Sequence, residues 1–278
     1  MADNMSARED TNINEKGAKL LAERKESPLV AKLTLGLGSL ITLIVLAWAI
    51  ELPLKLGAQW FEEQAMATCL GLTLAIIFIR YPFNGGRERM NLPWYDALLA
   101  LLGLGTCLYL VYMYGDIEAN PFAMRPTMFN IGIILIPMVW EALRRTTGWS
   151  LTVVFTVFVA YVFVGHLMPG MLEGKEQKFV RAIAELGVTN VAILGLPTKI
   201  IVLTVVLFIW MGQLLLHTGA SEWFTDLAAA IMGRSRGGSA KIAVVASGLF
   251  GSISGSAVSN VASTGVITIP LMRQAGYD

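Results

Sequence analysis

Six long apolar segments dominate the sequence and limit the folds that are open to it. Each contains very few charged side chains over about 20 residues, the length of helix needed to cross the hydrocarbon core of a bilayer. Charged residues make up only 15% of the 278 residues, whereas a soluble domain has about a quarter. The sequence therefore predicts an all-α integral membrane protein with about six transmembrane helices. The segments run roughly over residues 29–50, 64–80, 95–114, 126–143, 149–168 and 198–217.

Net charge argues against a nucleic-acid surface, and cysteine spacing argues against a metal site. A net charge of +1 gives no basic surface for a nucleic acid, so we expect membrane lipid rather than nucleic acid around this chain. Cys69 and Cys107 lie within apolar segments, and their spacing fits no metal site. We therefore expect both thiols to be buried packing groups.

The distribution of Lys and Arg predicts the orientation. The polar segment 1–28 has five of them and no apolar stretch typical of a signal peptide. The connections that follow are alternately poor and rich in Lys and Arg, and cytoplasmic loops are the rich ones. The sequence thus predicts a cytoplasmic N-terminus and places segment 169–197 outside. The connections carry, in order, Lys55; Arg80, Arg87 and Arg89; Arg125; and Arg144 with Arg145.

Two shorter segments have an apolar side at helical spacing. Residues 176–187 predict an amphipathic helix along the outer membrane surface, and residues 221–232 a similar one on the cytoplasmic side, with Ser221 as its N-cap. Two acidic residues, Glu141 and Asp96, lie near the ends of predicted spans. Glu141 precedes Arg144 and Arg145 at helical spacing, which predicts a structural ion pair, and Asp96 is expected to be solvated.

The last apolar region has an unusual composition. Residues 251–270 read GSISGSAVSNVASTGVITIP, and twelve of the nineteen residues 247–265 are Gly, Ser, Thr or Asn. Gly and Ser weaken a helix interior, and the apolar stretch 240–250 before them is too short to cross a bilayer. A break near Gly255 therefore predicts a re-entrant helical hairpin with an unwound tip. The small-residue spacing of Gly251 and Gly255 leaves plain helix packing open as an alternative.

Such broken segments are where membrane transporters hold ions and substrate. Residues 237–277, GGSAKIAVVASGLFGSISGSAVSNVASTGVITIPLMRQAGY, resemble the large membrane subunit of tripartite ATP-independent periplasmic (TRAP) transporters. The resemblance begins near Pro197 and is closest to fused permeases that work with TAXI-type solute-binding proteins. Those permeases start with a four-helix small subunit and a connecting helix, which is the order of the first five segments here.

The resemblance implies an elevator-type secondary transporter of the bacterial inner membrane. A periplasmic TAXI-type solute-binding protein would deliver an organic anion such as a dicarboxylate. A gradient of Na⁺ or H⁺ would drive uptake, with no other cofactor and no enzymatic reaction. By family position Ser254, Gly255, Ser256 and Asn260 would lie at the cation and substrate site, with Thr264 and Thr268 nearby. Ser256 and Asn260 are the candidate Na⁺ ligands.

The same resemblance divides the chain into four parts. They are a cytoplasmic tail (1–28), a four-helix scaffold (29–147), a connecting transmembrane helix with a periplasmic segment (148–197) and the start of the transport region (198–278). The family's large subunit has a second, inverted hairpin, so we expect this chain to be the first part of a longer permease. Two other functions stay open: an elevator transporter that needs no binding protein, and a membrane scaffold or anchor that does not transport.

Overall fold

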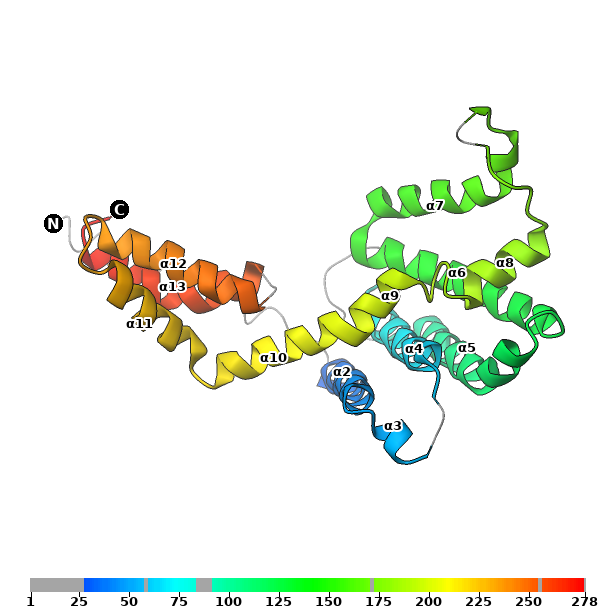
Figure 1. Cartoon of the computed structure of the whole chain (residues 1–278), viewed down its shortest axis with the longest axis horizontal. Coiled ribbons are helices and arrows are strands. Elements are labelled where there is room, and N and C mark those ends of the chain that lie inside the picture. Colours follow the sequence, from blue (N-terminus) through cyan, green and yellow to red (C-terminus); the bar gives the residue numbers. More distant parts are fainter. Residues whose placement is uncertain (1–27, 58–59, 84–91, 171–172, 255–256, 278) are drawn as a thin grey trace. The chain divides into compact units, whose positions relative to one another are not determined.

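A computed structural model describes residues 28–57, 60–83, 92–170, 173–254 and 257–277. Over these residues the chain is helical and contains no strand, as the sequence predicts (Figure 1). The helices form two compact units, one mainly of residues up to Lys199 and one mainly of residues from Ile200 onward.

Six of the described helices are long and apolar enough to cross a membrane, and they match the six predicted segments. The first five are α2 (Pro28–Ala49), α4 (Glu62–Arg80), α5 (Trp94–Ala119), α6 (Arg125–Thr147) and α7 (Trp149–Val164), which η1 (Gly165–Leu167) extends. The sixth is made of α9 (Leu196–Ile200), η3 (Ile201–Val205) and α10 (Val206–His217). Its middle section, η3, is a π-helical turn, which the sequence did not predict.

The shorter helices are α3 (Leu52–Lys55), α8 (Phe179–Val188), α11 (Ala220–Met232), α12 (Gly238–Ser254) and α13 (Ala257–Gln274). Glycines with positive φ lie in several of the connections between helices. Gly148 between α6 and α7, and Gly219 before α11, have φ of 76° and 86°, a conformation that side chains with a Cβ rarely adopt. Gly219 is the N-cap of α11, so the prediction that Ser221 caps this helix is wrong.

The core of the first unit lies between α4, α5 and α6. Phe78, Cys107 and Leu135, one from each helix, are fully buried, and Cys69 is buried as well, which confirms the packing role predicted for both cysteines. Close contact depends on small residues. A Cβ on Gly71 would lie 2.7 Å from the Cβ of Cys107, so α4 and α5 could not approach as closely with any larger residue there.

The predicted amphipathic helix exists as α8, and its apolar side packs on α6. The two backbones meet at Gly132 and Gly187, where a Cβ on Gly187 would lie 2.4 Å from the Cα of Gly132. Ile183 is buried in this contact, whereas Phe179 and Val180 at the start of the helix are exposed. The apolar side of α8 is therefore occupied in large part by another helix of the same unit.

A buried ion network joins the end of α6 to the start of α5. Arg145 donates to Asp96 at 2.8 Å and to Glu141 at 2.7 Å, and both the Arg145 and Asp96 side chains have at most 1% of their surface exposed. Glu141 also accepts from Arg144 at 2.8 Å, which confirms the predicted ion pair. Asp96 is fully buried, so the expectation that it is solvated is wrong. An aspartate can be buried here because a guanidinium lies against it.

Candidate functional site

The predicted site falls in the second unit, where α12 and α13 pack against each other as a hairpin (Figure 1). Helix α12 ends at Ser254 and α13 begins at Ala257, on either side of the break predicted near Gly255. Gly255 and Ser256 lie outside the described residues. Asn260, Thr264 and Thr268 follow one another at intervals of four along α13 and so share one face of that helix.

Apolar contacts hold the far end of the hairpin to α11. Ala228 from α11 packs with Ile242 and Ala246 from α12, and Leu271 from α13 joins them. Nearer the tip the rings of Phe224 and Phe250 meet edge to face, with 6.5 Å between their centres. This packing fixes the two hairpin helices side by side, which is the condition for polar groups to meet across them.

Asn260 makes a polar link between the two hairpin helices. Its Nδ2 donates to the Ser247 carbonyl oxygen at 3.1 Å and to the Ser247 Oγ at 2.9 Å. Gly251 lies beside this link, and a Cβ there would come within 3.0 Å of Nδ2. The glycine therefore leaves the space that the amide fills.

Two buried threonines continue this polar face along α13. The Thr264 Oγ1 donates to the Asn260 carbonyl at 2.7 Å and lies 3.5 Å from the Asn260 Oδ1. The Thr268 Oγ1 donates to the Thr264 carbonyl at 2.8 Å, and each threonine is only 4% exposed. Each hydroxyl uses its proton on the helix backbone, so its oxygen lone pairs remain available as acceptors.

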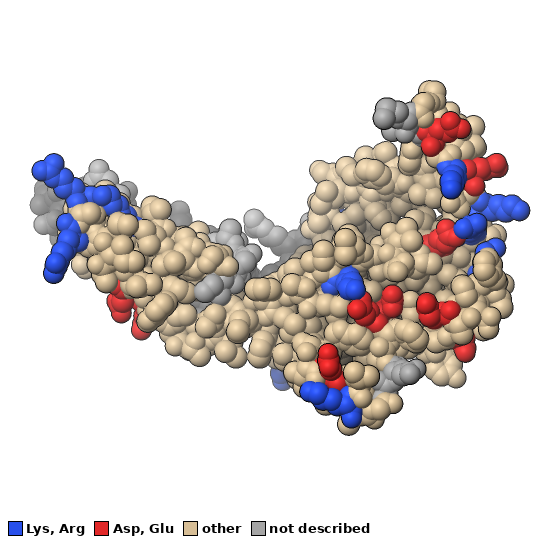
Figure 2. Space-filling model, viewed as in Figure 1, with Lys and Arg blue, Asp and Glu red and all other residues tan. Residues whose placement is uncertain are grey.

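Neutral oxygens and one amide are thus the polar groups that the described hairpin presents between its helices. The charged residues of α12 and α13 are Lys241 and Arg273, both exposed and far along the helices from the tip. Exposed Lys and Arg gather at that end of the unit (Figure 2). Hydroxyl and amide oxygens without a carboxylate suit a small monovalent cation or the polar groups of a substrate.

Sequence reasoning overlooked Ser247 as a member of this site. Ser247 lies eight residues before Gly255, where the break was predicted, whereas Asn260 lies five residues after it. Symmetry about the break therefore does not pair the two residues, and composition gives no reason to prefer Ser247 over its neighbours. Only the packing of α12 against α13 brings Ser247 to Asn260.

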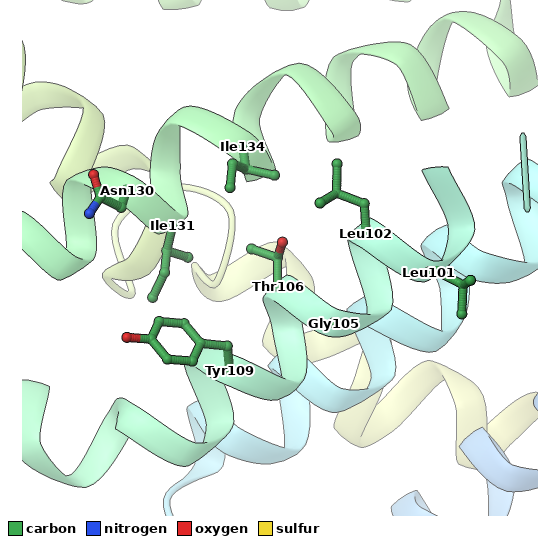
Figure 3. A pocket seen from close by; sticks show the side chains of 8 residues that line it. All are labelled: Leu101, Leu102, Gly105, Thr106, Tyr109, Asn130, Ile131 and Ile134. Carbon is green, nitrogen blue, oxygen red and sulfur yellow. The ribbon is translucent and has the colours of Figure 1, made fainter. Parts of the chain in front are cut away.

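A groove between α5 and α6 in the first unit is a less suitable site for a charged ligand. It has a volume of about 320 Å³, and Figure 3 shows Thr106 and Tyr109 facing Ile131 and Ile134 across it. None of the residues lining it carries a charge at neutral pH. An organic anion would lose its hydration there without gaining a charged partner.

Comparison with known proteins identifies the second half of the chain. Residues 134–278 match the profile of the family described as "Tripartite ATP-independent periplasmic transporter, DctM component". The chain belongs to this DctM family. The match begins within α6, well before Pro197, and it includes the whole hairpin. The family consists of transport permeases, and with its six apolar helices the chain is a multi-pass protein of the bacterial inner membrane.

Curated relatives agree with this DctM membership. The chain is 30% identical over 93 residues to a Haemophilus influenzae protein named "Putative TRAP transporter large permease protein", which covers 34% of this chain and 21% of that protein. It is 32% identical over 75 residues to the "2,3-diketo-L-gulonate TRAP transporter large permease protein YiaN" of Escherichia coli, covering 27% and 18%. The matched part spans about a fifth of each relative. No solved structure matches the chain significantly.

Proposed function

We propose that this DctM-family chain is part of the permease of a secondary transporter that takes up organic anions such as dicarboxylates. A periplasmic solute-binding protein of the TAXI type delivers the substrate, and the gradient of a small cation, Na⁺ or H⁺, drives its uptake by an elevator movement. The four helices before residue 148 act as a fused small-subunit scaffold. Family membership of residues 134–278 supports the permease role most directly.

The hairpin α12–α13 is our candidate for the cation and substrate site. We propose that it enters the membrane from the cytoplasmic side and ends at its tip within the bilayer. Asn260 Oδ1 and Thr264 Oγ1 lie 3.5 Å apart. For oxygen ligands about 2.5 Å from a metal ion, neighbouring corners of an octahedron are about 3.5 Å apart. These two oxygens therefore have the spacing of adjacent ligands, and Ser254, Ser256 and Thr268 are further candidates.

Reconstitution tests this proposal. The complete gene product is incorporated into proteoliposomes, and uptake of a labelled dicarboxylate is measured with and without the solute-binding protein, under an inward Na⁺ gradient, a pH gradient or neither. The proposal predicts uptake that needs both the binding protein and a cation gradient. Asn260→Ala is expected to abolish most of it, whereas Ser252→Ala, on an exposed position of α12, leaves it unchanged.

The alternatives give different results in the same experiment. A transporter that works without a partner would show gradient-driven uptake of the same size when the binding protein is left out. A scaffold or anchor would show no uptake above that of empty liposomes. A gene for a secreted binding protein next to this gene would add support for the TAXI type.

A further inference from the structure

The orientation of the Asn260 amide is decided by chemistry. An asparagine side chain has an NH₂ group that only donates and an oxygen that only accepts. The Ser247 carbonyl, 3.1 Å away, can only accept. Asn260 must therefore turn its NH₂ group toward α12, and its Oδ1 must point away from Ser247.

Turning the amide this way places Oδ1 beside Thr264. The Thr264 hydroxyl lies 3.5 Å from Oδ1 and 2.7 Å from the Asn260 carbonyl, so its proton goes to the carbonyl. A flipped amide would bring its NH₂ group to this position instead, and a donor there repels a cation. The Ser247 carbonyl therefore keeps the Asn260 oxygen, and not the NH₂ group, beside Thr264, and the Ser247 hydroxyl adds a second acceptor that holds the NH₂ group in place.

Gly251 leaves room on α12 for the Asn260 amide. Because a Cβ at this position would lie 3.0 Å from Nδ2, a glycine lets the amide sit in contact with α12. The backbone of α12 therefore supplies both the acceptors that hold the NH₂ group and the space in which it lies.

We propose that Ser247 is a positioning residue that fixes the Asn260 amide so that its oxygen faces a Na⁺ site on α13. This inference rests on the proposed function, since it assumes that the hairpin binds the coupling ion. Ser247 itself contributes no ligand to the ion. Its effect is on the affinity for Na⁺, whereas the packing of the hairpin by Ala228, Ile242 and Ala246 is independent of it.

The test is the Na⁺ dependence of uptake by the complete gene product with its binding protein, in proteoliposomes with choline replacing Na⁺. Ser247→Ala removes the acceptor at 2.9 Å and leaves the carbonyl. We expect the half-saturating Na⁺ concentration to rise about 3–10-fold, as for one lost hydrogen bond, while the maximal rate changes less than about twofold. Ser247→Thr keeps a hydroxyl and is expected to restore the wild-type value.

Ser252→Ala is the matched control, because Ser252 is on the same helix, is exposed, and its Oγ donates to the Leu249 carbonyl at 2.7 Å. It is expected to leave the half-saturating concentration unchanged. A second measurement separates positioning from stability: Na⁺ should raise the melting temperature of Ser247→Ala less than that of the wild type. A purely structural role would lower the melting temperature equally in Na⁺ and in choline.

The outcomes are distinguishable. Wild-type uptake could depend on Na⁺ while Ser247→Ala and Ser252→Ala have the same half-saturating Na⁺ concentration. That result overturns the positioning role and leaves the proposed function standing. If wild-type uptake responds to neither Na⁺ nor a pH gradient, the proposed function fails and the inference with it. Uptake driven by H⁺ alone overturns the Na⁺ site and leaves the transporter.

Discussion

Replacing Arg145 by methionine should destabilise the first unit strongly. The Arg145 guanidinium lies 2.8 Å from an Asp96 oxygen and 2.7 Å from a Glu141 oxygen. It also donates to the Tyr81 carbonyl at 3.2 Å and lies over the ring of Phe78. Methionine has a similar length and fills much of the volume, but it leaves the buried Asp96 carboxylate without its guanidinium.

Removing one partner of a buried ion pair costs about 3–5 kcal/mol. The upper part of this range applies here, because the Asp96 and Arg145 side chains are at most 1% exposed and water cannot replace the lost charge. At about 2–4 °C per kcal/mol for a unit of 150–250 residues, a cost of about 4–5 kcal/mol should lower the melting temperature by about 8–20 °C. Thermal unfolding of the purified chain in detergent, followed by tryptophan fluorescence, measures this shift.

Two further variants make the result specific to the buried pair. Arg181→Met removes an ion pair of similar geometry, in which Arg181 donates to Glu185 at 2.6 Å, but these side chains are 55% and 38% exposed. Its cost should be below about 1 kcal/mol. Adding Asp96→Asn to Arg145→Met removes the buried carboxylate charge that has lost Arg145 and should restore more than half of the lost stability. Equal shifts for Arg145→Met and Arg181→Met would refute the reasoning.

Other regions of the chain make three more predictions. Gly132→Ala should cost at least about 2 kcal/mol by overpacking, because its Cβ would lie 2.4 Å from the Ile183 carbonyl, whereas Gly105→Ala, which faces open space, should be nearly neutral in the same unfolding assay. Cys69 and Cys107 are buried, so N-ethylmaleimide should modify them only after denaturation in SDS; rapid labelling of the folded chain would show that the core is open. In a chain without these cysteines, Glu173→Cys should react with a membrane-impermeant maleimide added outside and Arg236→Cys should not; the reverse pattern would invert the predicted orientation.

Helix identity could be predicted from the sequence because it depends on local properties. The six long helices follow from apolar length alone, and α8 and α11 follow from helical spacing of apolar residues. The π-helical turn at Ile201–Val205 could not be predicted in the same way. It adds one residue to a turn within an evenly apolar segment, and five such residues have no period that distinguishes one helix type from another.

Contacts between helices were the harder part, and Asp96 shows why. An aspartate at the start of an apolar helix is equally consistent with a solvated end and with a buried ion pair. Its partner Arg145 is 49 residues away, and only the tertiary packing of α5 against α6 brings the two together. In the hairpin, the resemblance to the TRAP family indicated Asn260 and both threonines as candidates, but the partner of Asn260 depends on how α12 packs against α13. Whether those residues bind an ion stays a prediction.

The two units use polar groups in opposite ways, and this separates their roles. In the first unit, buried charges are neutralised within the unit by Asp96, Glu141, Arg144 and Arg145. These two acidic and two basic side chains balance in charge, and a gap in such a buried network is an energetic penalty for folding. In the hairpin, the hydroxyl protons of Thr264 and Thr268 and the NH₂ group of Asn260 are used within the protein, while their oxygens keep lone pairs. A cation is bound by oxygen atoms whose lone pairs are still available. Changes at Arg145 should therefore alter stability at every Na⁺ concentration, and changes at Ser247 or Asn260 should alter the response to Na⁺ itself.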